Sequence, residues 1–237
     1  MYDTLADFYD FLVPEALLSP EGSAAAFEDV VAELPAGARV LDCACGTGTL
    51  AVGLALRGFE VTASDASGGM VARTRALAAQ HEVRVEAMVR RWEELDGGPF
   101  DAVFCVGNSI THARDRRAAL VAMNGVLRDE RSGDEASGRG SGLLALTSRT
   151  WERPQDEGEE IVERHGRRAR VTHTWHPGEL EVTVSFDDDG TTYGERLQYW
   201  PFTHGELQDD LLATGFTPAA TTFDPEVARY LVTARAG

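Results

Sequence analysis

Short apolar runs alternate with segments of helical spacing over roughly the first 150 residues. Strands are predicted over residues 38–44, 59–65, 83–89, 100–108 and 142–148. Helices are predicted between them over residues 22–34, 46–58, 67–81 and 114–129, with Ser19 capping the first and Pro20 in its first turn. Nearly continuous apolar strands that alternate with helices are typical of a parallel sheet covered on both faces. We therefore expect a Rossmann-like, doubly wound α/β fold with a mostly parallel, seven-stranded sheet.

The pattern changes after Trp151, where apolar and polar residues begin to alternate with turn residues between them. This alternation predicts a small antiparallel sheet, inserted as a lid-like segment over residues 155–200. A helix over residues 203–216 and a final strand over residues 227–236 follow it. Residues 128–142 are polar and rich in Gly and Ser, which predicts a flexible loop. We expect residues 1–237 to form a single domain.

The composition excludes several functions. The formal net charge is −17, from 22 basic and 39 acidic residues, which disfavours a nucleic-acid partner. Every basic residue is arginine, so a Schiff-base lysine, a pyridoxal phosphate anchor and a P-loop lysine are all excluded. The chain has no apolar run of about 18 residues and no secretory leader, so we expect a cytoplasmic protein without a membrane partner. The oligomeric state stays open.

The cysteines and histidines do not suggest a metal centre. Cys43, Cys45 and Cys105 lie in apolar runs, which favours buried thiols over disulfides. The histidines at 165, 173 and 176 have no metal-like spacing with a carboxylate, so we expect them at the surface and expect no metal.

A glycine-rich turn follows the first predicted strand and opens a helix. Gly46 and Gly48 allow the backbone to turn tightly and a ligand to approach it. Free N–H groups at the start of the helix would face that ligand. Asp65 ends the second strand, where its carboxylate can accept hydrogen bonds from both ribose hydroxyls. The turn therefore predicts a cofactor that contains a nucleoside.

The run LDCACGTGTL resembles motif I of class I S-adenosylmethionine (SAM) methyltransferases, and it lacks the third glycine that a dinucleotide site needs. Four further segments are similar to the glycine N-methyltransferases and glycine/sarcosine methyltransferases: FDAVFCVGNSITHA, FEVTASDASGGMV, GLLALTSRTW and ERLQYWPFTHGEL. The resemblance covers roughly residues 36–235. It implies SAM as the cofactor and a small-molecule amine as the acceptor.

The resemblance also implies the site residues. Asp65 would hold the ribose, and Trp92 would offer a flat face to the adenine; Arg91 stands where the family has Asn or Asp. The full set expected to bind the cofactor is Tyr9, Ala44, Gly46, Gly48, Asp65, Ala66, Met70, Arg91, Trp92, Val106 and His112. Asn108, Arg149 and Tyr199, the last with Trp200 as its alternative, would hold the acceptor. Arginine suits a carboxylate because its planar fork binds both oxygens.

These residues predict a SAM-dependent N-methyltransferase that acts on a small, carboxylate-bearing amine such as glycine or sarcosine. Two alternatives stay open. One is a natural-product methyltransferase of the same fold, which acts on an amino sugar or another N- or O-acceptor. The other is a non-catalytic, SAM-binding regulator.

Overall fold

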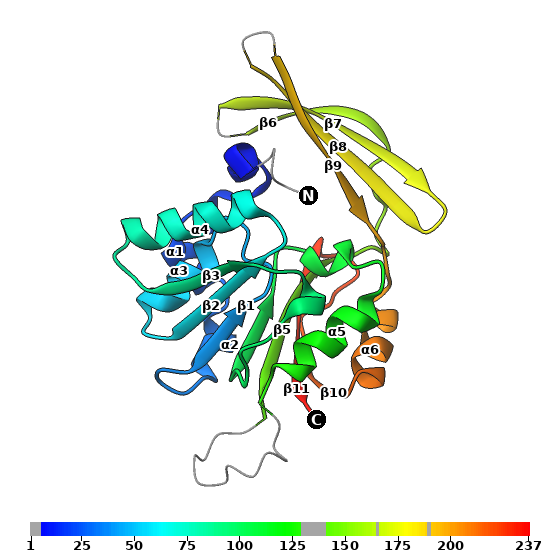
Figure 1. The fold of residues 1–237 in the computed structure, drawn as a ribbon. Helices are drawn as coiled ribbons and strands as arrows, with labels where there is room; N and C mark the ends of the chain where they lie inside the picture. The colour runs from blue at the N-terminus through cyan, green and yellow to red at the C-terminus, as the bar shows by residue number, and fades with distance from the viewer. Residues whose placement is uncertain (1–5, 129–140, 165, 189–190) are drawn as a thin grey trace.

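The centre of the molecule is a seven-stranded sheet with the order β10-β11-β5-β4-β1-β2-β3 (Figure 1). The structure, a computed structural model, describes residues 6–128, 141–164, 166–188 and 191–237. Strand β11 runs antiparallel to its neighbours β5 and β10, and the other pairings are parallel. The strands are β1 (Arg39–Asp42), β2 (Glu60–Asp65), β3 (Val85–Val89), β4 (Ala102–Cys105), β5 (Leu143–Arg149), β10 (Phe216–Thr221) and β11 (Arg229–Ala236).

Helices cover both faces of this sheet, so the predicted doubly wound fold is confirmed. Helices α5 and α6 pack on one face, and α2, α3 and α4 pack on the other, each side with its own apolar cluster. The expected helix over residues 22–34 is divided into α1 and α2, although Ser19 caps it as predicted, by accepting the N–H of Gly22 at 3.0 Å. The helices are α1 (Pro20–Ala25), α2 (Glu28–Ala32), α3 (Thr49–Leu56), α4 (Gly68–Gln80), α5 (Arg116–Gly125) and α6 (His204–Ala213).

A second sheet of four antiparallel strands lies beyond the end of the first, at the top of Figure 1. It falls within the predicted insertion. One of its faces packs on Phe11 and Trp151 in a separate apolar cluster, and the 3₁₀ helix η1 (Ala6–Leu12) contributes to this contact. Its strands are β6 (Gly158–Arg164), β7 (Arg167–His176), β8 (Glu179–Asp188) and β9 (Thr191–Tyr199).

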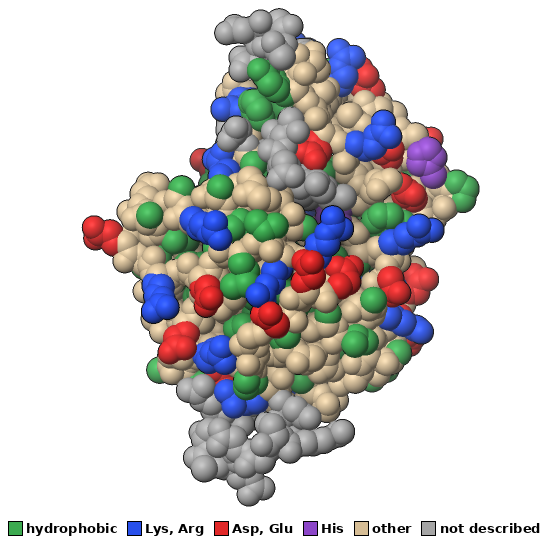
Figure 2. All heavy atoms as spheres, viewed as in Figure 1, with side chains coloured by type: hydrophobic (Ala, Val, Ile, Leu, Met, Phe, Trp, Pro, Cys, Tyr) green, Lys and Arg blue, Asp and Glu red, His purple; other side chains and the backbone are tan. Residues whose placement is uncertain are grey.

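Three further expectations can be compared with the structure. Cys43, Cys45 and Cys105 are buried free thiols, as predicted. Residues 129–140, most of the predicted flexible loop, lie outside the described residues. Within the described part of the chain, no helix is both long and apolar enough to cross a bilayer. On the face shown in Figure 2, arginine and acidic side chains are interspersed.

Candidate active site

The ends of four parallel strands bring the predicted site residues to one edge of the large sheet. Asp42 ends β1, Asp65 ends β2, and Arg149 ends β5. Strand β4 ends at Cys105, directly before Val106. Neighbouring parallel strands end at the same edge, and this edge is where open α/β sheets bind ligands.

The carboxylate of Asp65 stabilises the glycine-rich turn. Its Oδ2 accepts the N–H of Gly46 at 3.0 Å, and its Oδ1 accepts the N–H of Ser67 at 2.9 Å. Ser67 then caps α4 by accepting the N–H of Met70. Met70 itself is 1% exposed. The first turn of α4 and the glycine turn are therefore positioned by one carboxylate.

Both glycines of the turn lie close to other parts of the protein. Gly48 has a φ of +88°, and a Cβ there would lie 2.8 Å from the Cα of Thr74 on α4. The absence of a side chain at Gly48 therefore allows α3 and α4 to approach each other. The ring of Tyr9 lies over Gly46, where a Cβ would be 3.5 Å from it. Tyr9, from η1, thus packs against the turn.

A cavity of about 470 Å³ opens beside the glycine turn. The indole N–H of Trp92 donates to the carbonyl of Cys43 at 2.9 Å, which fixes the ring at the wall of this cavity. Six of the predicted cofactor residues line it: Ala44, Asp65, Ala66, Arg91, Trp92 and His112. Tyr9, Gly46, Gly48, Met70 and Val106 surround the same strand ends without lining it.

Burial changes the titration of groups around the cavity. It raises the pKa of Asp42 to about 7, with a smaller contribution from the negative charge of Asp65. It lowers the pKa of His112 to about 4, so this imidazole is neutral at physiological pH. The pKa of the Tyr9 phenol is raised by burial and by Asp65, which keeps it protonated.

Asn108 connects the ends of β4 and β5. It has a left-handed backbone conformation, with a φ of +70°, and is 5% exposed. Its amide oxygen, which the sequence analysis assigned to the acceptor amine, accepts the backbone N–H of Arg149 at 2.9 Å. Asn108 therefore positions the residue expected to bind the acceptor carboxylate.

Tyr199 joins the small sheet to the large one. Its ring centre lies 4.5 Å from that of His112 and 6.0 Å from that of Trp151. The His112 Nδ1 bonds to the carbonyl of Gln198 at 2.6 Å, and the N–H of Trp200 donates to the carbonyl of Thr111 at 2.7 Å. These contacts tie β9 to the 3₁₀ helix η4 (Ser109–His112), beside the cavity.

Two residues at this site were not predicted from the sequence. Asp42 is 1% exposed and is the acidic residue that opens the run DCACGTG, so its place in that run could have identified it. Trp151 packs against Arg149, whose guanidinium carbon lies 5.2 Å from the centre of the indole ring. Trp151 follows the end of β5 by two residues, and this position alone does not mark it as a site residue.

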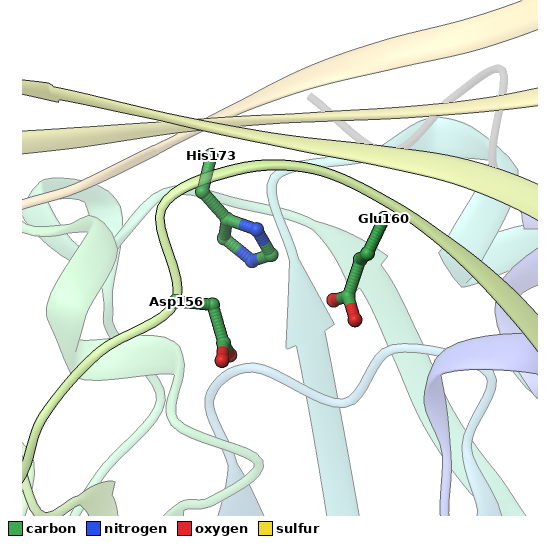
Figure 3. A group of neighbouring side chains, drawn as sticks. All are labelled: Asp156, Glu160 and His173. Carbon is green, nitrogen blue, oxygen red and sulfur yellow. The ribbon is translucent and has the colours of Figure 1, made fainter.

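The expectation of surface histidines was wrong for His173, which is 8% exposed. Ala169 and Val171, which alternate with His173 along β7, are also buried. His173 therefore belongs to the covered face of the small sheet. Figure 3 shows it near Asp156 and Glu160, and the ligand atoms of the three lie within 4.8 Å of one another. Both carboxylates are exposed. His176 is exposed, as predicted, and residue 165 is outside the described residues.

Comparisons with known proteins bear on the type of fold. Residues 40–130 match the model of a family described as "Methyltransferase domain". The fold over the whole chain is that of SAM-dependent methyltransferases, as the resemblance implied. The CcbJ methyltransferase from Streptomyces caelestis has a TM-score of 0.81 at 20% identity, covering 99% of this chain and 97% of that one.

The most informative sequence relative is the glycine/sarcosine N-methyltransferase of Parasynechococcus marenigrum (strain WH8102). It is 35% identical over 194 residues, which are 76% of this chain and 64% of the relative. The glycine N-methyltransferase of Oryctolagus cuniculus is 42% identical over 89 residues, 32% of this chain and 30% of the relative. The chain thus spans less than two thirds of the length of these curated relatives.

A third similarity is to CalS10, an amino pentose methyltransferase from Micromonospora echinaspora. Its TM-score is 0.74 at 23% identity, over 100% of this chain and 98% of that one. At this identity the likeness shows the fold.

Proposed function

We propose that the protein transfers the methyl group of SAM to the amine of a small acceptor that carries a carboxylate, of the glycine or sarcosine type. The observation that carries this proposal is that the cavity and the residues expected to hold the acceptor lie together at one edge of the sheet. His112 lines the same cavity as Asp65 and Trp92, and its ring contacts Tyr199, which is connected through Trp151 to Arg149. The similarity to glycine/sarcosine N-methyltransferases supports the same acceptor class.

The residues around the cavity fit SAM. Its volume of about 470 Å³ is within the usual range for small-molecule sites. Asp65 would accept the ribose hydroxyls, and Trp92 would pack against the adenine. When bound, SAM supplies an electrophilic methyl group on a sulfonium. A neutral His112 suits a cationic ligand, because a charged imidazole would repel it.

The acceptor would be held on the other side. Arg149 would bind its carboxylate, and Asn108 would fix Arg149 through the backbone contact already described. Tyr199 would close the site beside His112. In-line transfer depends on placing the two reacting atoms correctly, and positioning of this kind supplies about 7–11 kcal/mol in well-oriented intramolecular reactions. The amine must bind with its lone pair free, and the mechanism requires no metal.

The small sheet, residues 155–200, would serve as a lid within a single domain, residues 1–237. Its covered face contacts η1, and β9 is bonded to η4 at the cavity. Excluding water there would strengthen the charged contacts to the acceptor.

Mass spectrometry tests the proposal. Purified protein would be incubated with SAM and two amine panels, matched in size, with and without a carboxylate. The proposal predicts that the carboxylate-bearing amines gain 14 Da and that S-adenosylhomocysteine forms in equal amount.

Products from amino sugars instead would favour the natural-product methyltransferase, a possibility suggested by the name of the CalS10 neighbour. SAM binding with no product from either panel would favour the non-catalytic regulator. Either result would contradict the proposed acceptor class.

A further inference from the structure

Two arginines face each other at the acceptor side of the crevice. Arg229 is the first residue of β11, and its register partner on β5 is Arg149. Directly opposite residues of an antiparallel pair have Cβ atoms about 4.5–5.5 Å apart on the same face of the sheet. Because β11 runs antiparallel to β5, its first residue lies at the same edge as the glycine turn. Like charges in this arrangement destabilise a sheet.

Neither guanidinium is neutralised within the described part of the chain. No carboxylate there lies within ion-pair distance of Arg149 or Arg229. Other arginines of this chain do have such partners: Arg116 pairs with Asp210, and Arg128 lies 3.0 Å from Asp101.

The groups around the pair are hydrogen-bond donors and further positive charge. The indole N–H of Trp151 is buried and has no acceptor among the described residues. Burial and then the positive charge of Arg149 lower the pKa of Arg229, and Arg164 on β6 acts in the same direction. The phenols of Tyr9 and Tyr199 are close enough to act on Arg229 in the opposite direction. An anion bound between the two guanidinium groups would relieve their repulsion.

We propose that Arg149 and Arg229 form a two-arginine anion subsite, which selects amine acceptors with two negative charges over those with one. The proposal rests on the proposed function. A single carboxylate would neutralise one guanidinium and leave the other without an acidic partner, at a site where Arg149 is half-buried and Arg229 is exposed. Two carboxylates, or one phosphonate dianion, would neutralise both through charged hydrogen bonds. Arg229 is therefore a specificity-determining residue for the acceptor.

The test compares Arg229→Gln with Arg149→Gln, and Arg235→Gln serves as the matched control. Arg235 lies on the same strand, but it pairs with Glu33 near the other end of β11. Substrates are glycine with one carboxylate, iminodiacetate with two, and aminomethylphosphonate at a pH where it is a dianion. We expect the wild type to prefer a doubly charged amine by at least about tenfold in kcat/KM.

We expect Arg229→Gln to lower kcat/KM for the doubly charged amines about 10- to 100-fold and for glycine less than about threefold. Arg149→Gln would lower both, and Arg235→Gln neither. The dissociation constant of SAM would stay unchanged in all three, and Arg229→Lys would recover part of the loss. The preference between iminodiacetate and the phosphonate shows which dianion the subsite takes. An equal loss on all three amines, or no loss in Arg229→Gln, would overturn the proposal.

A binding measurement separates this proposal from the proposed function. Calorimetric titration of iminodiacetate and of aminomethylphosphonate into protein loaded with S-adenosylhomocysteine needs no turnover. If the wild type binds one of these compounds and Arg229→Gln weakens that binding at least about tenfold, the subsite is supported, even if no amine is methylated. If the wild type binds neither compound more tightly than glycine, the proposal is wrong, even if glycine is a substrate.

Discussion

The two sides of the crevice are assembled differently. On the cofactor side, contacts join residues that follow each other within the β–α alternation: Gly46 and Asp65 are 19 residues apart, and Cys43 and Trp92 are 49 apart. On the acceptor side, His112 bonds to a carbonyl 86 residues away, and Arg149 faces a residue on the last strand. The cofactor side is thus built from consecutive β–α units, whereas the acceptor side also needs β9 and β11, which come much later in the chain.

The largest effect should come from the carboxylate that serves the cofactor side. Asp65→Ala should raise the dissociation constant of SAM about 100-fold. Charged hydrogen bonds are worth about 1.5–3 kcal/mol each, and the glycine turn also loses the carboxylate that accepts the N–H of Gly46. Calorimetric titration measures this. Asp96→Ala is a control, because that carboxylate pairs with Arg90 near the cavity wall. Unchanged affinity in Asp65→Ala would remove this residue from the cofactor site.

The matching change on the acceptor side is Arg149→Ala. We expect kcat/KM for a carboxylate-bearing amine to fall about 10- to 100-fold, which corresponds to about 1.4–2.8 kcal/mol of lost interaction. The affinity for SAM should be nearly unaffected, and activity on amines without a carboxylate should be spared. Steady-state kinetics on both classes of amine measure the difference. If both classes lose activity equally, the carboxylate-binding role is wrong.

The strands and helices that carry the cofactor side could be predicted from the sequence, because they follow the α/β alternation. Strand β10 was not located, since its sequence FTPAAT includes a proline and no clear apolar run. The pairing of Arg149 with Arg229 could not be predicted, because it depends on the antiparallel register of a strand 80 residues further on. His173 shows a missed pattern: it continues the buried alternation of Ala169 and Val171.

A further effect concerns the stability of the fold and depends on pH. Burial raises the pKa of Asp42 from 3.8 to about 7, so the folded protein retains a proton that the unfolded chain has released. This carboxyl therefore destabilises the fold increasingly as pH rises from about 4 to 7, and fully above 7. Asp42→Asn should be more stable than the wild type at pH 8, by on the order of 2–4 kcal/mol, and similar to it near pH 4. Urea unfolding at both pH values measures this. A difference independent of pH would contradict the assignment.

The connection between the two sides can be weakened at His112. In His112→Phe the ring against Tyr199 remains, whereas the bond to the carbonyl of Gln198 is lost. We expect kcat/KM for the acceptor to fall about three- to tenfold. A comparable loss in Arg196→Gln, an exposed change on the same strand as Gln198, would show that the effect is not specific to this bond.

We expect the smallest effect from removing metal ions. Treatment with a chelator should leave kcat unchanged, because in-line methyl transfer needs no Lewis acid here. His173→Gln, in the group with Asp156 and Glu160, should behave in the same way. Loss of activity that zinc or manganese restores in the wild type, but not in the variant, would contradict this expectation.

The most direct test of the account is a crystal structure with S-adenosylhomocysteine and a methylated carboxylate-bearing amine. The account predicts the adenosine in the cavity lined by Asp65 and Trp92, with the ribose hydroxyls on Asp65. It predicts the amine beside the contacting rings of His112 and Tyr199, with its carboxylate on Arg149. Adenosine bound elsewhere, or an acceptor carboxylate that does not reach Arg149, would contradict the division of the crevice into a cofactor side and an acceptor side.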